Sequence, residues 1–364
     1  MCLISGISKK GCINLTIFVL PQILIISYIV FVLHITHLAK RIQLLPQYYQ
    51  DEVQQGEDQQ YLNDEFEINS GEVTKKIEQY IEAYDNRFDK DEKLDGDFSQ
   101  IAEVDMQVLE NGKKLIDFQK FYHDFQSYNM PIVLRNAVKH WKAIFKWQSD
   151  EYLVSKIGDR EVQVEVREDG ENKFAYFQKN FVKSSMKYNE FIQIYKDPNR
   201  KANYYLAEFG IPEEIVEDIE EIELGLFMNL EYTNFWQGAS GTESLPHTDD
   251  KDNFLCQITG KKTIILIPPT QRSKLYVGDG KNKIRNYSQV DFFNPNLQNF
   301  PLFSQIKGKM KVEINPGDAL FIPAFWWHHV KSSNERNLAI NFWYTPNFMH
   351  SLFQSILESD EFNQ

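Results

Sequence analysis

The chain has 364 residues, of which 42% are hydrophobic and 14% aromatic, so it is long enough for one or two globular domains with a sizeable core. Its net charge of −13 is confined to one stretch, because 18 acidic and five basic residues lie between Asp51 and Asp105. The remainder is neutral overall, so the charge neither supports nor excludes a nucleic-acid substrate. The three cysteines exclude a disulfide-based fold and favour a reducing compartment.

The N-terminal part contains an almost continuously apolar run, residues 13–38. A run of this length can span a bilayer as a helix. It is longer than the apolar region of a signal peptide, and no small-residue cleavage site follows it. We therefore expect a transmembrane helix or signal anchor after a short tail, residues 1–12. The alternatives are a cleaved signal peptide and an upstream extension of the gene model. Lysine and arginine flank the run almost equally on both sides, so the side of the membrane stays open.

The next segment, residues 39–100, is polar, acidic and rich in glutamine, which is typical of a linker. It is either a solvated spacer or an acidic docking arm for a basic partner. From residue 101 the pattern becomes that of a folded domain, which we expect to extend to residue 350. The polar stretch 351–364 is expected to be a C-terminal tail.

The first half of the domain mixes helices and strands. Residues 115–125 have helical spacing, and residues 131–134 are a short buried strand. Residues 161–166 alternate with period two, as a half-buried strand does. Ile215, Ile219 and Ile222 recur with helical spacing behind Pro212, so we expect an amphipathic helix that begins near this proline.

Strands dominate the second half. Residues 254–258 and 263–267 flank Thr259-Gly260-Lys261, which predicts a hairpin. Residues 316–318 predict a tight turn into a buried strand at 319–323, and residues 337–344 are expected to form the last strand. The predicted fold class is therefore an all-β core with peripheral helices.

Two motifs supply the residue types of a metal centre. His247-Thr248-Asp249 is the first, and His328 follows 79 positions after Asp249. Successive residues of a strand point to opposite faces, so His247 and Asp249 point the same way, whereas Asp250 is expected to be a solvated loop acid. Two histidines and one carboxylate form an iron(II) site that leaves about three coordination positions open. Zinc is the rival metal, since it takes the same ligands.

Two neighbouring histidines compete for the third ligand position. On a regular strand, His329 faces the same side as Lys331, which favours water, whereas His328 faces the same side as Val330. Parity therefore favours His328.

Four segments together resemble one family. Residues 247–249, 253–262, 316–328 and 341–343 read HTD, NFLCQITGKK, PGDALFIPAFWWH and NFW. They are similar to JmjC-type oxygenases of the cupin-like branch, over residues 104–344. That branch includes the hypoxia-factor asparaginyl hydroxylase and the tRNA wybutosine hydroxylase. The resemblance implies a double-stranded β-helix, a jelly-roll barrel of two antiparallel sheets with helices packed outside.

The resemblance also implies iron(II), dioxygen and the cosubstrate 2-oxoglutarate. Lys262 matches the lysine that holds the distal carboxylate of the cosubstrate, while Lys261 should face outward. The tyrosine with the same task matches Tyr205, although Tyr204 is an alternative. The remaining cosubstrate residues implied by the family are Ser244, Asn253 and Asn341.

The expected function is an iron- and 2-oxoglutarate-dependent hydroxylase that acts on side chains of a protein or peptide and is anchored to a membrane through residues 13–38. An RNA hydroxylase of the wybutosine type is one alternative. A catalytically silent cupin that binds a partner is another. Demethylation is the same chemistry on an N-methyl group, and the oligomeric state stays open.

Overall fold

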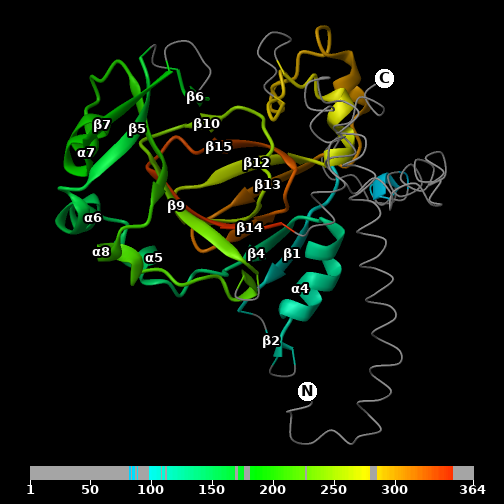
Figure 1. Cartoon of the computed structure of the whole chain (residues 1–364), viewed down its shortest axis with the longest axis horizontal. Coiled ribbons are helices and arrows are strands. Elements are labelled where there is room, and N and C mark those ends of the chain that lie inside the picture. The colour runs from blue at the N-terminus through cyan, green and yellow to red at the C-terminus, as the bar shows by residue number, and fades with distance from the viewer. Residues whose placement is uncertain are drawn as a thin grey trace, which may run out of the picture. The chain divides into compact units, whose positions relative to one another are not determined.

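The computed structural model describes residues 82, 84–86, 88, 98–107, 109–110, 113–168, 171–175, 181–225, 228–278 and 285–346. All of them belong to one compact unit, Lys75–Gln364. Two large sheets form this unit, with short helices beside them (Figure 1).

The described residues of the larger sheet form nine strands in the order β1-β4-β14-β11-β16-β9-β8-β5-β7. Its ladders are antiparallel except for β1 with β4, which is parallel. The strands are β1 (Ala102–Asp105), β4 (Ile132–Arg135), β5 (Glu161–Arg167), β7 (Phe181–Lys187), β8 (Asn203–Gly210), β9 (Leu230–Gly238), β11 (Asp252–Thr259), β14 (Ala319–Ile322) and β16 (Asn337–Tyr344).

The smaller sheet has five strands in the order β13-β12-β15-β10-β6. Only the pair β10 with β6 is parallel in it. The strands are β6 (Lys173–Phe174), β10 (Glu243–Ser244), β12 (Lys262–Ile267), β13 (Met310–Ile314) and β15 (Trp327–Ser332). A separate two-stranded ribbon consists of β2 (Leu109–Glu110) and β3 (Lys113–Lys114).

Four strands of each sheet face one another as a jelly-roll barrel. They are β9-β16-β11-β14 on one side and β13-β12-β15-β10 on the other (Figure 1). From β9 to β16 the chain passes back and forth between the two sheets, except that β12 and β13 both belong to the small sheet and pair with each other; this is the connectivity of a double-stranded β-helix. Side chains such as Leu255, Ile264 and Leu320 fill the space between the sheets at one end. The predicted jelly-roll core is therefore confirmed.

The outer face of the large sheet carries the largest apolar cluster. Alternate residues of β5, including Val162, Val164 and Val166, are buried there, as the period-two pattern predicted. Trp141 and Trp147 from the helical segments pack on the same face. The helices and helical turns are α4 (Phe118–Asp124), η2 (Gln126–Tyr128), α5 (Lys142–Lys146), α6 (Asp150–Ile157), α7 (Tyr188–Lys196), α8 (Glu213–Val216), η3 (Glu223–Gly225), η4 (Pro269–Lys274) and η5 (Pro301–Gln305).

The outer face of the small sheet is covered by the connection between β12 and β13, which carries η4 and η5. Leu275, Phe292 and Phe303 from this connection pack against Ile265 and Trp327 of the sheet. This cover explains why the outward side chains at this end of the sheet are buried.

The predicted hairpin around Gly260 is wrong. Its two strands, β11 and β12, belong to different sheets and do not pair. Gly260 has a φ of +71° and turns the chain from one sheet to the other. A Cβ at this position would lie 2.6 Å from the carbonyl oxygen of Arg336, so the tight connection also requires the missing side chain.

The predicted amphipathic helix behind Pro212 is much shorter than expected. Pro212 is the N-cap of α8, and the helix ends at Val216. Ile215 and Ile222 are still buried, and Ile219 packs beside them. The spacing of the isoleucines therefore predicted their burial correctly. Irregular backbone, rather than a helix, brings Ile219 and Ile222 to the core.

The packed body extends upstream of residue 101. Tyr84 and Phe88 are 2% and 5% exposed, and the ring of Phe88 lies edge-on against Trp326 at 6.3 Å.

No helix in the described part of the chain is long and apolar enough to cross a membrane, and the apolar run 13–38 lies outside that part. The tail 351–364 lies outside it as well.

Candidate metal centre

Three side chains from two neighbouring segments converge inside the barrel. His247 forms a backbone bridge with His328, with N–H to carbonyl distances of 3.0 and 2.8 Å. The carboxylate of Asp249 lies 3.8 Å from His247 Nε2 and 3.3 Å from His328 Nε2. The three potential ligand atoms all lie within 4.8 Å of one another. His247, Asp249 and His328 therefore form the face that the sequence predicted, and they are brought together by the bridge between their segments.

The backbone fixes the orientation of both imidazoles. His247 Nδ1 lies 2.7 Å from the carbonyl oxygen of Leu245, and His328 Nδ1 lies 2.9 Å from that of Trp326. A carbonyl only accepts hydrogen bonds, so each Nδ1 carries the proton. The lone pair of each Nε2 is then free to bind a metal, and the second hydrogen bond holds the ring in place.

The charges of the three side chains also suit a cation. Burial and the neighbouring His328 lower the pKa of His247 to about 4, so it is a neutral donor at neutral pH. Burial opposes ionisation of Asp249, but the two imidazoles outweigh it and hold its pKa below the usual value. Burial opposes protonation of His328, but the neighbouring Asp249 outweighs it and raises the pKa of His328, so a metal competes with a proton at this nitrogen. Two imidazole nitrogens and one carboxylate oxygen are ligands that fit iron(II), and zinc accepts the same set.

The neighbours of these residues lie where strand parity placed them. Asp250 is exposed. His329 points to the opposite face from His328, although it is fully buried rather than solvated. Its Nε2 lies 2.9 Å from Glu243, which explains how a polar side chain is accommodated there.

His329 belongs to a second group of residues with metal-ligand types, together with Glu243 and Asp291. The ammonium of Lys173 lies 3.1 Å from Glu243 and 2.6 Å from Asp291. This cation already neutralises the two carboxylates and occupies the space between them. The group is therefore a buried ion-pair network that joins β6, β10 and β15, not a second metal centre.

A buried lysine lies on the same barrel face as the metal triad. In the ladder of β12 with β15, Leu266 pairs with His328 and Lys262 pairs with Ser332. The backbone of Lys262 is therefore four residues, or roughly 13 Å, along the ladder from the position opposite His328. Lys262 is 4% exposed, and its Nζ donates to Ser332 Oγ at 2.9 Å. Among the described residues it has no carboxylate partner. Burial lowers its pKa to about 8.

A buried ammonium without a carboxylate partner in the described structure favours binding of an anion. Burial of a charge costs free energy that only a partner of opposite charge offsets. Lys261, by contrast, lies outside and pairs with Glu313 at 3.2 Å, as the sequence predicted for the outward lysine of the two.

Hydroxyl groups continue from Lys262 across the barrel. Thr242 Oγ1 donates to Ser332 Oγ at 3.0 Å, and the side chain of Thr242 also hydrogen-bonds Tyr205. Tyr204 instead packs against the apolar cluster on the outer face. The structure thus places Tyr205, not Tyr204, on the chain of hydroxyl groups that leads to the lysine. The sequence analysis did not predict a role for Thr242 or Ser332. Ser332 lies four residues after His328 and therefore faces the same side of a regular strand, which was a usable signal.

The remaining residues lie on the same inner face. Asn341 Nδ2 donates to Asn253 Oδ1 at 2.6 Å, and these strands pair directly. Ser244 Oγ accepts from the backbone N–H of Val330 at 3.3 Å. Trp343 belongs to the same face and has a buried indole N–H without a partner in the described structure. Polar groups therefore line the barrel between the triad and Lys262.

Comparison with known proteins agrees with this arrangement. The family model described as the cupin-like domain matches residues 118–350. Lysine-specific demethylase 8 of Xenopus tropicalis is 34% identical over 222 residues, which are 59% of this chain and 48% of the relative. Jumonji C domain-containing protein 5 of Drosophila melanogaster is 29% identical over 226 residues, 59% of this chain and 54% of the relative.

A plant relative extends the same comparison. Lysine-specific demethylase JMJ30 of Arabidopsis thaliana is 30% identical over 235 residues, 63% of this chain and 53% of that protein. The chain thus spans about half the length of the curated relatives it matches. With the jelly-roll barrel and the matched residues, these findings show that the chain belongs to the JmjC-type, cupin-like oxygenase family.

Proposed function

We propose that the protein is an iron(II)- and 2-oxoglutarate-dependent oxygenase. The observation that carries this proposal is the pairing of two features on one barrel face. A two-histidine, one-carboxylate triad lies at one end, and the buried Lys262, which lacks a carboxylate partner in the described structure, lies further along the same strands.

Each group of residues has a separate task in this proposal. His247, Asp249 and His328 hold the metal through two imidazole nitrogens and one carboxylate oxygen. Lys262 binds the distal carboxylate of 2-oxoglutarate. Iron(II), with 2-oxoglutarate and dioxygen, supplies the oxidising power that an unactivated C–H bond requires.

The hydroxyl and amide groups orient the cosubstrate. Ser332 holds the ammonium of Lys262, and Thr242 links it to Tyr205, so that the hydroxyls are positioned around the site of the distal carboxylate. Ser244 lies on the neighbouring strand. The amides of Asn253 and Asn341 hydrogen-bond each other and are neutral groups that steady a carboxylate without competing for the metal.

A protein side chain is the substrate we propose, and hydroxylation is the expected reaction. Tyr232 is 45% exposed, and its ring lies 5.9 Å from that of Trp343 on the inner face. Burial and the charges of Asp249 and Asp250 raise the pKa of Tyr232, so both carboxylates lie near its hydroxyl; the nearby Lys251 opposes this shift and is paired with Glu231 at 2.9 Å. Aromatic faces beside carboxylates favour a neutral or cationic side chain and disfavour phosphates. The RNA alternative receives no support from this surface.

Demethylation of N-methyl-lysine is a second candidate. Two of the relatives reported above are named lysine-specific demethylases, which favours a substrate of that kind. The same site can oxidise an N-methyl group or a side-chain carbon, so the product decides between the two reactions. The silent-cupin alternative is disfavoured because all three ligands and Lys262 are present.

Product analysis tests the proposal. Peptides that carry lysine, methyl-lysine, arginine or asparagine are incubated with the full chain, iron(II), 2-oxoglutarate and dioxygen, and mass spectrometry follows them. We expect a gain of one oxygen atom, whereas loss of a methyl group with release of formaldehyde would identify a demethylase. The Asp249→Ala variant is the control that must produce neither. Modification of an RNA panel without modification of any peptide would contradict the protein-substrate proposal.

We also propose that residues 13–38 anchor the protein to a membrane, because their length and apolar composition suit a spanning helix. Extraction of isolated membranes with alkaline carbonate tests this. The full chain should stay with the membranes, and a variant without residues 1–38 should be released. Release of both would contradict the anchor.

A further inference from the structure

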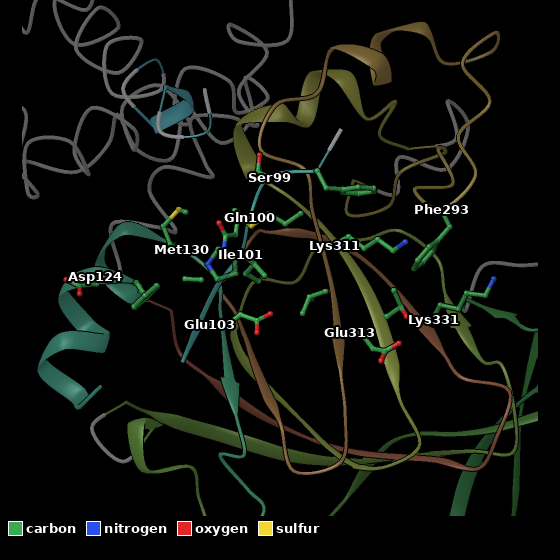
Figure 2. Close-up of a pocket in the computed structure, with 17 residues that line it drawn as sticks. Ser99, Gln100, Ile101, Glu103, Asp124, Met130, Phe293, Lys311, Glu313 and Lys331 are labelled. Atoms are coloured by element: carbon green, nitrogen blue, oxygen red, sulfur yellow. The ribbon is translucent and has the colours of Figure 1, made fainter. Parts of the chain in front are cut away.

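A groove with a volume of about 1070 Å³ runs along the edge of the small sheet, between β13 and the segment that leads into β1 (Figure 2). Ser99, Gln100 and Ile101 line one side, and Lys311 and Glu313 of β13 line the other. None of the three metal-triad residues lines it. The groove is therefore distinct from the proposed active site.

The β13 side of the groove is an open strand edge. In the part of the chain that the structure describes, β13 is the last strand of its sheet and forms a ladder only with β12. The carbonyls of Lys309 and Glu313 point away from that ladder, since Ser99 N–H donates to the first at 2.7 Å and Arg135 Nη1 donates to the second at 2.9 Å. Lys311 lies two residues from each of them, so its backbone N–H and carbonyl also point away from β12.

The chain itself leaves this edge incompletely paired. The segment from Ser99 forms a single bridge, with Met310, and then moves on to β1. In the described structure, neither the carbonyl of Lys311 nor the N–H of Glu313 has a hydrogen-bond partner. Unpaired groups of this kind along an edge are the template onto which an extended peptide adds as a new strand.

The opposite wall is a second strand edge. Among the described residues, β1 is the last strand of the large sheet and pairs only with β4. Its first two residues, Ala102 and Glu103, are exposed. Buried Met310 and Val312 and the partly buried Phe125 form an apolar floor between the two edges. The groove thus combines strand-edge hydrogen-bonding groups with an apolar floor.

The acidic groups of the groove already have partners. Glu103 pairs with Arg135 at 2.7 Å, and Glu313 pairs with Lys261 at 3.2 Å. The third carboxylate in the lining, Asp124, pairs with Lys120 on α4.

The groove lining holds three carboxylates and two lysines, and because the carboxylates are paired with basic residues outside the lining, the lysines are the charged groups left to meet an occupant. Lys311 has no carboxylate partner in the described part of the chain, and its ammonium lies 5.8 Å from the ring of Phe98. Lys331 is exposed, and its partner Glu243, at 3.4 Å, is shared with Lys173 and His329. The groove therefore favours an anionic occupant.

We propose that this groove binds an extended, acidic peptide segment of a partner protein, which adds as a strand to the open edge of β13. Its backbone would pair with Lys311 and Glu313, and its carboxylates would lie beside Lys311 and Lys331. The strand-edge groups favour a peptide, because a polynucleotide offers no matching series of backbone N–H and carbonyl groups. This inference does not depend on the reaction that the metal centre catalyses.

Fluorescence anisotropy of a labelled peptide tests the proposal on the full chain. The probe alternates glutamate and valine, and a peptide that alternates lysine and valine is its matched control. The glutamate peptide should bind, less tightly as salt rises, and the lysine peptide should not.

Two pairs of variants then separate charge from backbone pairing. Lys311→Glu should weaken binding about three- to tenfold, whereas Lys142→Glu, the same change at an exposed helical position, should not. Glu313→Pro removes the N–H that faces the groove together with the side-chain carboxylate, and it should also weaken binding about three- to tenfold. Glu313→Ala is its control, because it removes the carboxylate but keeps the N–H. Thermal denaturation verifies that each variant is folded.

Three results would overturn the proposal. One is equal affinity of the glutamate and lysine peptides. Another is unchanged binding of the glutamate peptide in folded Lys311→Glu and Glu313→Pro proteins. The third is self-association that both variants abolish while neither peptide binds, which would make a second copy of the chain the occupant.

Discussion

Removing the charge of Lys262 should have two opposite effects: the cosubstrate-free protein should become more stable, and its affinity for 2-oxoglutarate should fall. Lys262→Met keeps the length of the buried side chain and removes its charge. Lys262 is 4% exposed, and in the described structure its ammonium donates only to Ser332, so burial lowers its pKa from 10.5 to about 8. At about 1.4 kcal/mol per pKa unit, the charge costs the cosubstrate-free protein roughly 3 kcal/mol at neutral pH.

The stability change has a defined dependence on pH. Between about pH 8 and pH 10.5 the unfolded chain keeps this proton, whereas the folded protein has lost it. The native protein therefore gains stability relative to the Lys262→Met variant as the pH rises through this window. Without cosubstrate, Lys262→Met should be more stable than the native chain at pH 7, by up to about 3 kcal/mol, and this difference should vanish above the window.

The binding change has the opposite sign. Loss of a charge-assisted hydrogen bond costs about 1.5–3 kcal/mol, so the affinity of the manganese-loaded protein for 2-oxoglutarate should fall about ten- to hundredfold. Calorimetry measures this affinity, and denaturant unfolding measures stability. Lys261→Met is the control, since this exposed lysine pairs only with Glu313 in the described structure. Lower stability with unchanged 2-oxoglutarate affinity in Lys262→Met would show that the lysine is structural and would refute the reasoning.

Three further predictions follow from the site and the barrel. Asp249→Ala should weaken manganese binding at least about a hundredfold in calorimetry, while Asp250→Ala should leave it unchanged; equal effects would contradict the assigned ligand. Tyr205→Phe should raise the 2-oxoglutarate concentration needed for half-saturation about three- to tenfold, and Tyr204→Phe should not; the reverse order would assign the other tyrosine. Gly260→Ala should destabilise the fold by about 1–3 kcal/mol in urea, because φ is +71° and the new Cβ meets a carbonyl oxygen; unchanged stability would show that the turn relaxes easily.

Local patterns in the sequence predicted many strands of the two sheets. The alternation of β5 and the buried segments of β14 and β16 lie where periodicity placed them. Parity along β15 also separated His328 from His329, because neighbouring strand residues must face opposite sides. Such predictions succeed because they depend only on the geometry of one strand.

Pairing between strands could not be predicted in the same way. A short turn at Gly260 looked like a hairpin, but periodicity does not report which sheet a strand joins. The burial of His329 depends on Glu243, which is 86 positions away. The link from Lys262 through Ser332 and Thr242 to Tyr205 similarly joins distant segments and exists only after the barrel has closed.

The most direct test of the central claim is the turnover of 2-oxoglutarate to succinate in the absence of any other substrate. The native chain with iron(II) and dioxygen should produce succinate, and a chelator should stop the reaction. His247→Ala should remove this activity, because a metal ligand is lost. An absence of iron-dependent succinate in the native, folded protein, or equal activity in His247→Ala, would contradict the assignment of the triad as an iron- and 2-oxoglutarate-dependent centre.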